Sequence, residues 1–163
     1  ALLEGVTYYF RAGLDSIAIS GHKMIGSPLP CGVVVAKKKN VDRIARSIEY
    51  VGTLVTTILG SRSAMAPLFL WYALRAVGLK EFRRRIDHCF ETADYAVERL
   101  RQVGRRAWRH RNSVTVVFDR PSMRLIRKWQ LAAHHDVAHL ITMPHVTRRQ
   151  VDRLVEDIGP AKK

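Results

Sequence analysis

The spacing of apolar residues changes along the chain, and at first it predicts short strands. Asp15–Ser20 alternates and is rich in isoleucine, which is typical of a strand, and Gly32–Ala36 is β-branched and almost continuously apolar, which favours a buried strand. Val41–Ile48 predicts a short helix. Thr53–Arg62 has no clear period and contains Gly60, so we expect a loop there.

Two helical segments follow. Ser63–Val77 is apolar almost all round, which predicts a helix that is buried on several sides, and Gly78 marks its end. In Glu81–Val103 the apolar residues recur at spacings of three and four, which predicts an amphipathic helix. Gly104 comes directly after this segment, and we expect the helix to stop there.

From Glu81 on, the predicted order of elements is roughly helix, strand, strand, helix, strand and helix. Ser113–Phe118 and Val137–Met143 predict strands, with a helix expected over residues 121–131 between them. Thr147, with Gln150 three residues later, is a capping-box pattern that predicts the start of a last helix. This order suits a small α+β domain in which helices cover one face of a sheet.

Composition indicates a soluble, folded chain. Apolar residues make up 47% of its 163 residues. The longest apolar run, Ala64–Leu74, is too short to span a bilayer, and no charged segment precedes an apolar one at the beginning, so we expect neither a membrane partner nor a signal peptide. Cys31 and Cys89 form no CxxC pair and no metal-ligand spacing, which favours a reduced, cytoplasmic compartment and no metal site.

The charge raises an alternative function. Lysine and arginine number 28 against 14 acidic residues, a net charge of +14, and the excess concentrates in Arg101–Lys128. Such a segment could make the chain a basic module that binds nucleic acid or another polyanion without catalysis. An arginine-rich genome, or acidic residues elsewhere in a longer protein, would give the same composition. Charge alone is a non-specific signal, so we expect no nucleic-acid partner.

The end of the first strand holds the residues best suited to chemistry. Gly21-His22-Lys23 follows it as a turn. A lysine at the end of a buried strand is unusual, and a shielded amine loses its proton more readily and can condense with an aldehyde to a Schiff base. Ser20 and His22 could donate hydrogen bonds to a phosphate. The alternative is that Lys23 is an ordinary solvated turn residue.

A family resemblance bears on this choice. Asp15–Gly32, which includes the Ser27-Pro28-Leu29-Pro30-Cys31-Gly32 motif, resembles the cofactor-lysine segment of the group II pyridoxal-phosphate-dependent amino acid decarboxylases. The resemblance is to the branch of the bacterial histidine decarboxylases and the plant serine decarboxylases. It continues in order through five further segments, which are Lys38–Ile44, Ile58–Arg62, Pro67–Trp71, Asn112–Phe118 and Ala138–Pro144.

The resemblance implies an α/β fold, the carboxyl-terminal part of a type I aminotransferase-like fold. Residues 1–78 would be the end of the cofactor-binding large domain with a connecting helix, and residues 79–163 the small α+β domain. Lys23 would carry pyridoxal 5'-phosphate, and His22 and Ser20 would contact the cofactor. Ser61 and Arg62 match a loop near the site or the subunit interface, although capping and loop packing would also explain them.

The resemblance also implies a reaction, the decarboxylation of an amino acid by a homodimer with its active site at the subunit interface. Histidine, giving histamine, is the expected substrate and serine the second. In relatives Ser-Arg is usually followed by Asn-Gly-His, whereas Ser63-Ala64-Met65 stands here, a departure that bears on substrate contact.

Part of the expected site would lie upstream of this chain. The aspartate that pairs with the cofactor ring nitrogen in relatives would fall just before Ala1, so we expect the 163-residue piece alone to decarboxylate poorly. A third interpretation is a truncated product that folds incompletely and aggregates through exposed apolar surface.

Overall fold

The computed structural model describes residues 10–48, 52–56 and 63–160. The chain divides into two compact units, Ala1–Arg83 and Arg84–Lys163, which are considered separately below. Within the described ranges, no helix is both long and apolar enough to cross a membrane.

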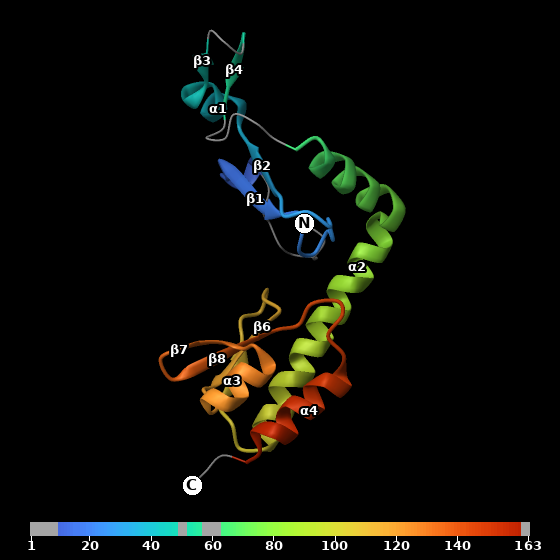
Figure 1. Ribbon diagram of the computed structural model, residues 1–163, viewed down its shortest axis with the longest axis vertical. Helices are drawn as coiled ribbons and strands as arrows, with labels where there is room; N and C mark the ends of the chain where they lie inside the picture. The colour runs from blue at the N-terminus through green and yellow to red at the C-terminus, as the bar shows by residue number, and fades with distance from the viewer. Residues whose placement is uncertain (1–9, 49–51, 57–62, 161–163) are drawn as a thin grey trace. The chain divides into compact units, whose positions relative to one another are not determined.

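The first unit is built on an antiparallel hairpin, shown in blue in Figure 1. Strands β1 (Ser16–Ser20) and β2 (Gly32–Ala36) pair along their whole length, which confirms both predicted strands. A short 3-10 turn, η1 (Phe10–Ala12), precedes them. At the open end of the hairpin Lys37 Nζ lies 3.0 Å from Asp15 Oδ1, and this hydrogen bond lowers the pKa of the Asp15 carboxyl.

The segment after the hairpin differs from the prediction. Helix α1 (Lys38–Ile44) begins and ends earlier than expected, and β3 (Arg46–Ile48) pairs with β4 (Thr53–Val55) where a helix end and a loop were predicted. Gly52, with φ of 65°, lies in the left-handed region that favours glycine, so a tight connection is possible just before β4. The periodicity missed this hairpin because each strand has only three residues.

Helix α2 (Met65–Gln102) joins the two predicted helices across Gly78, whose φ of 72° and ψ of 161° are not helical. The predicted break at this glycine is therefore confirmed. The expected burial is wrong in the first unit. Apolar residues of α2 before the break are exposed, as are two of β2, and these are Met65, Leu68, Trp71, Tyr72, Leu74, Val34 and Val35. The described residues provide no second layer over them.

One close contact fixes the turn after β1. A Cβ atom placed on Gly21 would lie 2.5 Å from Cys31 Sγ and 2.7 Å from Leu70 Cδ2. Both distances are shorter than real Cβ contacts, so any larger residue at this position must displace the side chains of Cys31 and Leu70. The turn therefore lies directly against β2 and α2.

The second unit is a sheet covered by helices, in yellow to red in Figure 1. Its strands lie in the order β5-β6-β8-β7 and are all antiparallel. After α2 the elements are β5 (Ala107–Arg109), β6 (Thr115–Asp119), α3 (Met123–Trp129), β7 (Ala132–His134), β8 (Val137–Ile141) and α4 (Arg148–Ile158). The predicted α+β arrangement is confirmed, although no pattern revealed β7, a three-residue strand with two alanines.

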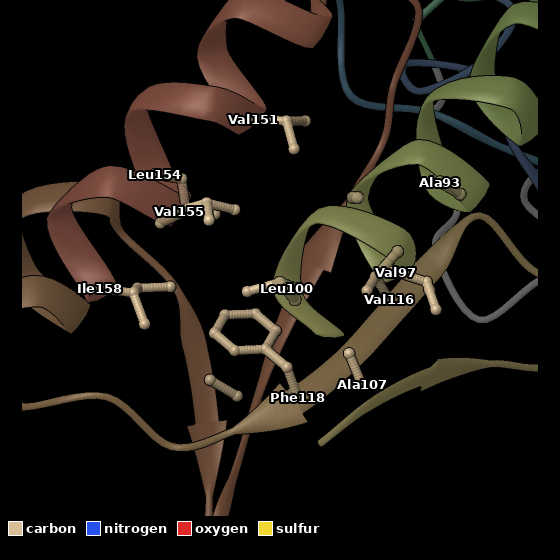
Figure 2. Close-up of a cluster of buried hydrophobic side chains, with 12 residues drawn as sticks. Ala93, Val97, Leu100, Ala107, Val116, Phe118, Val151, Leu154, Val155 and Ile158 are labelled. Atoms are coloured by element: carbon tan, nitrogen blue, oxygen red, sulfur yellow. The ribbon is translucent and has the colours of Figure 1, made fainter. Parts of the chain in front are cut away.

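The core of this unit joins α2, α4 and the strands β5, β6 and β8 (Figure 2). Val116 and Phe118 of β6 are fully buried beneath Leu100 of α2 and Leu154 of α4. The predicted amphipathic face of 81–103 and the last helix supply most of the core, and its buried members are Ala93, Ala96, Val97, Leu100, Ala107, Val116, Phe118, Ala138, Val151, Leu154, Val155 and Ile158.

Polar contacts also join the elements of this unit. Thr147 caps α4 in the predicted capping box with Gln150. Asp152 of α4 accepts hydrogen bonds from Tyr95 Oη at 2.7 Å and Arg99 Nε at 2.8 Å, both on α2. These two donors, Tyr95 first, lower the pKa of the Asp152 carboxyl.

A buried hydroxyl joins α2 to the end of β8. Thr142 is fully buried, and its Oγ1 lies 2.8 Å from the Cys89 carbonyl oxygen and 3.0 Å from that of Val114. Thr92, also buried on α2, has no hydrogen-bond partner for its hydroxyl among the described residues. The two threonines therefore have opposite effects on stability, because one hydroxyl is satisfied and the other is not.

We expect Thr142→Val to lower the free energy of unfolding of the second unit by about 1 kcal/mol, the net value of one hydrogen bond. Thr92→Val, which has the same shape change, should be neutral or stabilising. Hydrogen exchange of the β6 and β8 amides measures both effects. Equal destabilisation by the two changes would contradict this assignment.

Asp152 should make the second unit sensitive to acid. Its folded-state pKa lies below the ordinary value of 3.8, so its contribution is present above that value and is lost as the pH falls through the folded-state pKa. Asp152→Asn should lower the thermal midpoint at neutral pH. The thermal midpoint of this variant should then fall less than that of the unaltered protein as the pH becomes acidic. Thermal midpoints of both proteins between neutral and strongly acidic pH provide the comparison, and parallel curves would refute it.

Gly21→Ala should disrupt the turn after β1, because overpacking of this kind costs about 1–3 kcal/mol. Gly32→Ala is the matched control, since its added Cβ meets no described atom within 4 Å. The Ser27 and Cys31 amides should exchange faster in Gly21→Ala and at the original rate in Gly32→Ala. Unchanged exchange in Gly21→Ala would show that the contact with Cys31 and Leu70 is not restrictive.

Candidate functional site

Lys23 lies in a closed turn between β1 and β2. The Gly21 amide donates to the Cys31 carbonyl at 2.9 Å, and the Ser27 amide donates back to the Gly21 carbonyl at 2.9 Å. Within the turn, the Gly26 amide donates to the Lys23 carbonyl at 3.1 Å. Residues 21–27 therefore form a loop whose two ends are tied together, with Lys23 between them.

The Ser27 side chain bonds to the main chain at the end of this loop. It is 5% exposed, and its hydroxyl donates to the Leu29 carbonyl at 3.0 Å while the Leu29 amide lies 3.3 Å from the same oxygen. Pro28 and Pro30 fix their own φ and restrict the residues before them. The Ser-Pro-Leu-Pro-Cys-Gly motif is thus a conformationally restricted segment that connects the turn to β2.

His22 contacts the same restricted segment. Its Nδ1 lies 3.2 Å from the Cys31 amide nitrogen and 3.1 Å from the Cys31 carbonyl oxygen. No described residue bonds to its Nε2, and the side chain is exposed. His22 is therefore held through one ring nitrogen while the other is free for a ligand.

The structure brings Ser20, His22 and Lys23 together in one turn. Ser20 is half-buried at the end of β1, opposite Gly32, and the Lys23 amine makes no hydrogen bond or ion pair with the described residues. A primary amine can condense with an aldehyde, and an imidazole N–H and a hydroxyl can donate to a phosphate. These donors suit pyridoxal 5'-phosphate, which carries both groups.

The expected shielding of Lys23 is wrong for this part of the chain, because the side chain is exposed. The hairpin and the first half of α2, next to the turn, also expose apolar residues, so the layer that would cover the site is not formed by the described residues.

Two predicted positions and one motif need separate mention. Ser61 and Arg62 lie outside the described residues. Ser63, Ala64 and Met65, the departure from the relatives' pattern, are exposed at the start of α2. The described residues hold no group of three or more side chains suited to a metal ion.

Sequence reasoning missed the supporting role of Cys31 and Leu70. Both residues fall within segments that carry the family resemblance, yet the sequence did not indicate that both lie against Gly21. The Ser-Pro-Leu-Pro-Cys-Gly motif was the available signal for Cys31. No signal in a single sequence identified Leu70, because its contact depends on how α2 packs.

The basic segment is largely engaged within the second unit. Arg109 binds Asp94 through two nitrogens, at 2.6 and 2.7 Å, which lowers the pKa of that carboxyl. Further intramolecular contacts are Arg101 with the Ala107 carbonyl, Arg106 with Asp119 and Asp136, Arg120 with the His135 carbonyl, and Lys128 with Asp157. The alternative of a polyanion-binding module finds no support.

Comparison with known proteins agrees with the chemistry of the turn. Residues 10–119 match the family described as the pyridoxal-dependent decarboxylase conserved domain. The histidine decarboxylase of Morganella morganii is 51% identical over 152 residues, which cover 93% of this chain and 40% of that protein. The histidine decarboxylase of Pseudomonas entomophila is 49% identical, with 93% and 38% covered.

A solved structure extends the comparison to the fold. The L-methionine decarboxylase of Streptomyces sp. 590 superposes with a TM-score of 0.75 at 32% identity, covering 88% of this chain and 31% of that chain. This chain thus spans about two fifths of the length of its curated relatives. The resemblance found in the sequence and the α/β fold that it implied are confirmed, and the chain belongs to the pyridoxal-dependent decarboxylase family.

Proposed function

We propose that this chain forms part of a pyridoxal-phosphate-dependent histidine decarboxylase and carries its cofactor lysine, Lys23. The observation that carries the proposal is the closed turn of residues 21–27, where the Lys23 amine, which no described residue binds, follows His22 and Ser20 inside the segment that matches the family. Because the chain spans two fifths of its relatives, the activity belongs to the longer polypeptide.

Lys23 has two tasks in this proposal. Its Nζ would hold the cofactor at the aldehyde group, and the same amine would carry the proton that takes the place of the departing carboxylate. The cofactor, when bound, supplies the electron sink for the bond that breaks. The restricted segment through Ser27 and the prolines keeps the lysine main chain in place during both tasks.

His22 and Ser20 hold the phosphate in this proposal. His22 Nε2, which no described residue binds, and the Ser20 hydroxyl belong to residues that flank Gly21 in the sequence, and both groups can donate to an anion. Hydrogen bonds to a charged phosphate are stronger than those between neutral groups.

The relatives favour histidine as the substrate. The two bacterial relatives near 50% identity are both named histidine decarboxylases. Methionine is the substrate named for the solved structure at 32% identity, so the fold accepts more than one amino acid. Ser61 and Arg62 remain proposed as a loop near the site or the interface, and serine remains the second candidate substrate.

The exposed apolar surface of the first unit supports a larger assembly. Val34 is 70% exposed and Trp71 is 60% exposed, and isolated soluble domains rarely leave such residues open together. We assign their cover to the rest of the polypeptide and to a second subunit of a homodimer. The same cover would shield Lys23.

The full-length polypeptide tests the assignment of Lys23. Lys23→Ala should abolish the visible absorbance of the lysine-bound cofactor and lower the rate of CO₂ release from histidine by more than about 100-fold. Lys39→Ala, an exposed lysine of α1, should change neither. Retained absorbance in Lys23→Ala, or no release of CO₂ from histidine by the unaltered protein, would overturn the proposal.

A further inference from the structure

The peptide of Cys31 has one unusual partner. Its carbonyl already accepts from the Gly21 amide at 2.9 Å, whereas its N–H has only His22 Nδ1, at 3.2 Å, among the described residues. The Gly21 carbonyl, which could have taken that N–H across the hairpin, accepts from Ser27 instead. The Cys31 N–H is therefore left with the imidazole as its acceptor.

This arrangement decides which ring nitrogen of His22 carries the proton. If Nδ1 were protonated, it would give the Cys31 carbonyl a second hydrogen bond and leave the Cys31 N–H without an acceptor. With Nδ1 unprotonated, the Cys31 N–H keeps an acceptor in the protein and the Cys31 carbonyl keeps its Gly21 donor, whereas with Nδ1 protonated the N–H would depend on solvent. The neutral ring therefore accepts at Nδ1 and is protonated at Nε2.

We propose that the main chain of Cys31 is a positioning group that fixes His22 as its Nε2–H tautomer and aims that N–H away from the hairpin as an anion donor. The tautomer stands on the hydrogen bonds alone, whereas the anion's identity, the cofactor phosphate, rests on the proposed function. Cys31 acts through His22 and touches no reacting atom.

The surroundings of Cys31 keep this geometry rigid. Pro30, directly before Cys31, has a fixed φ, and the Gly21 amide donates a hydrogen bond to the Cys31 carbonyl. Cys31 Sγ lies 2.5 Å from where a Gly21 Cβ would be, so the absence of a side chain at Gly21 leaves room for the Cys31 thiol. The same glycine meets Leu70 of α2, which supports the turn from the other side.

The direct test measures the tautomer. In the full-length, cofactor-free protein with ¹⁵N-labelled histidine, the neutral His22 ring should show a protonated Nε2 and an unprotonated Nδ1. A protonated Nδ1 would overturn the proposal. This measurement needs neither cofactor nor activity, so it remains decisive if the proposed enzymatic function fails.

Two substitutions separate the two ring nitrogens. In His22→Asn the side-chain oxygen can replace Nδ1, so the Cys31 amide should stay protected from exchange while the outward donor is lost. In His22→Gln the longer amide can replace the Nε2 donor, but the Cys31 amide should exchange faster. His110→Asn, an exposed histidine of the second unit, is the control and should change neither property.

Binding of two probes completes the test. His22→Asn should weaken binding of pyridoxal 5'-phosphate about 10- to 100-fold, the loss of one hydrogen bond to a charged group, and should leave binding of pyridoxal, which lacks the phosphate, unchanged. His22→Gln should retain more of the phosphate-dependent affinity than His22→Asn. Equal weakening of both probes by His22→Asn, or a Cys31 amide unaffected by His22→Gln, would refute the positioning role.

Discussion

The absence of a side chain at Gly21 is the constraint on which the candidate site depends. Because Cys31 Sγ and Leu70 fill the space where a Cβ would be, the turn after β1 lies in contact with both β2 and α2. That contact brings the Cys31 peptide within reach of His22 and allows the Ser27 amide to close the loop. The position of Lys23 thus follows from close packing at a residue that does no chemistry itself.

The two units are stabilised in different ways. The second has a continuous core in which residues of α2, β6, β8 and α4 are fully buried, and its helices are joined by buried or half-buried hydrogen bonds. The first has the chemistry but little core, since its strands and helix leave apolar side chains in solvent. Exposed apolar surface is thus concentrated in the unit that holds the candidate site, in a chain about two fifths as long as its relatives.

Long periodic patterns predicted the fold best. The apolar spacing of 81–103 and the capping box at Thr147 are local features with many supporting positions, and both elements formed as expected. The three-residue strands β3, β4 and β7 have too few positions to show a period, so they depend on pairing partners. The prediction that residues 63–77 are buried was wrong for another reason. The pattern indicates which residues are apolar but not whether other parts of the protein cover them. For the candidate site, the resemblance proposed Lys23, His22 and Ser20, and these stay predictions, while the Cys31 and Leu70 contacts required coordinates.

The side chain of Arg105 shows one structural role of the many basic residues. Its guanidinium donates to the carbonyls of Ile158, Gly159 and Pro160, at the end of α4, where the helix dipole is negative and main-chain oxygens lack partners. A lysine carries its three donors on one nitrogen, whereas the guanidinium spreads its donors over a planar fork that spans these oxygens. Arg105 thus satisfies main-chain carbonyls at the C-terminal end of α4. Part of the surplus of positive charge therefore serves intramolecular hydrogen bonds within the second unit.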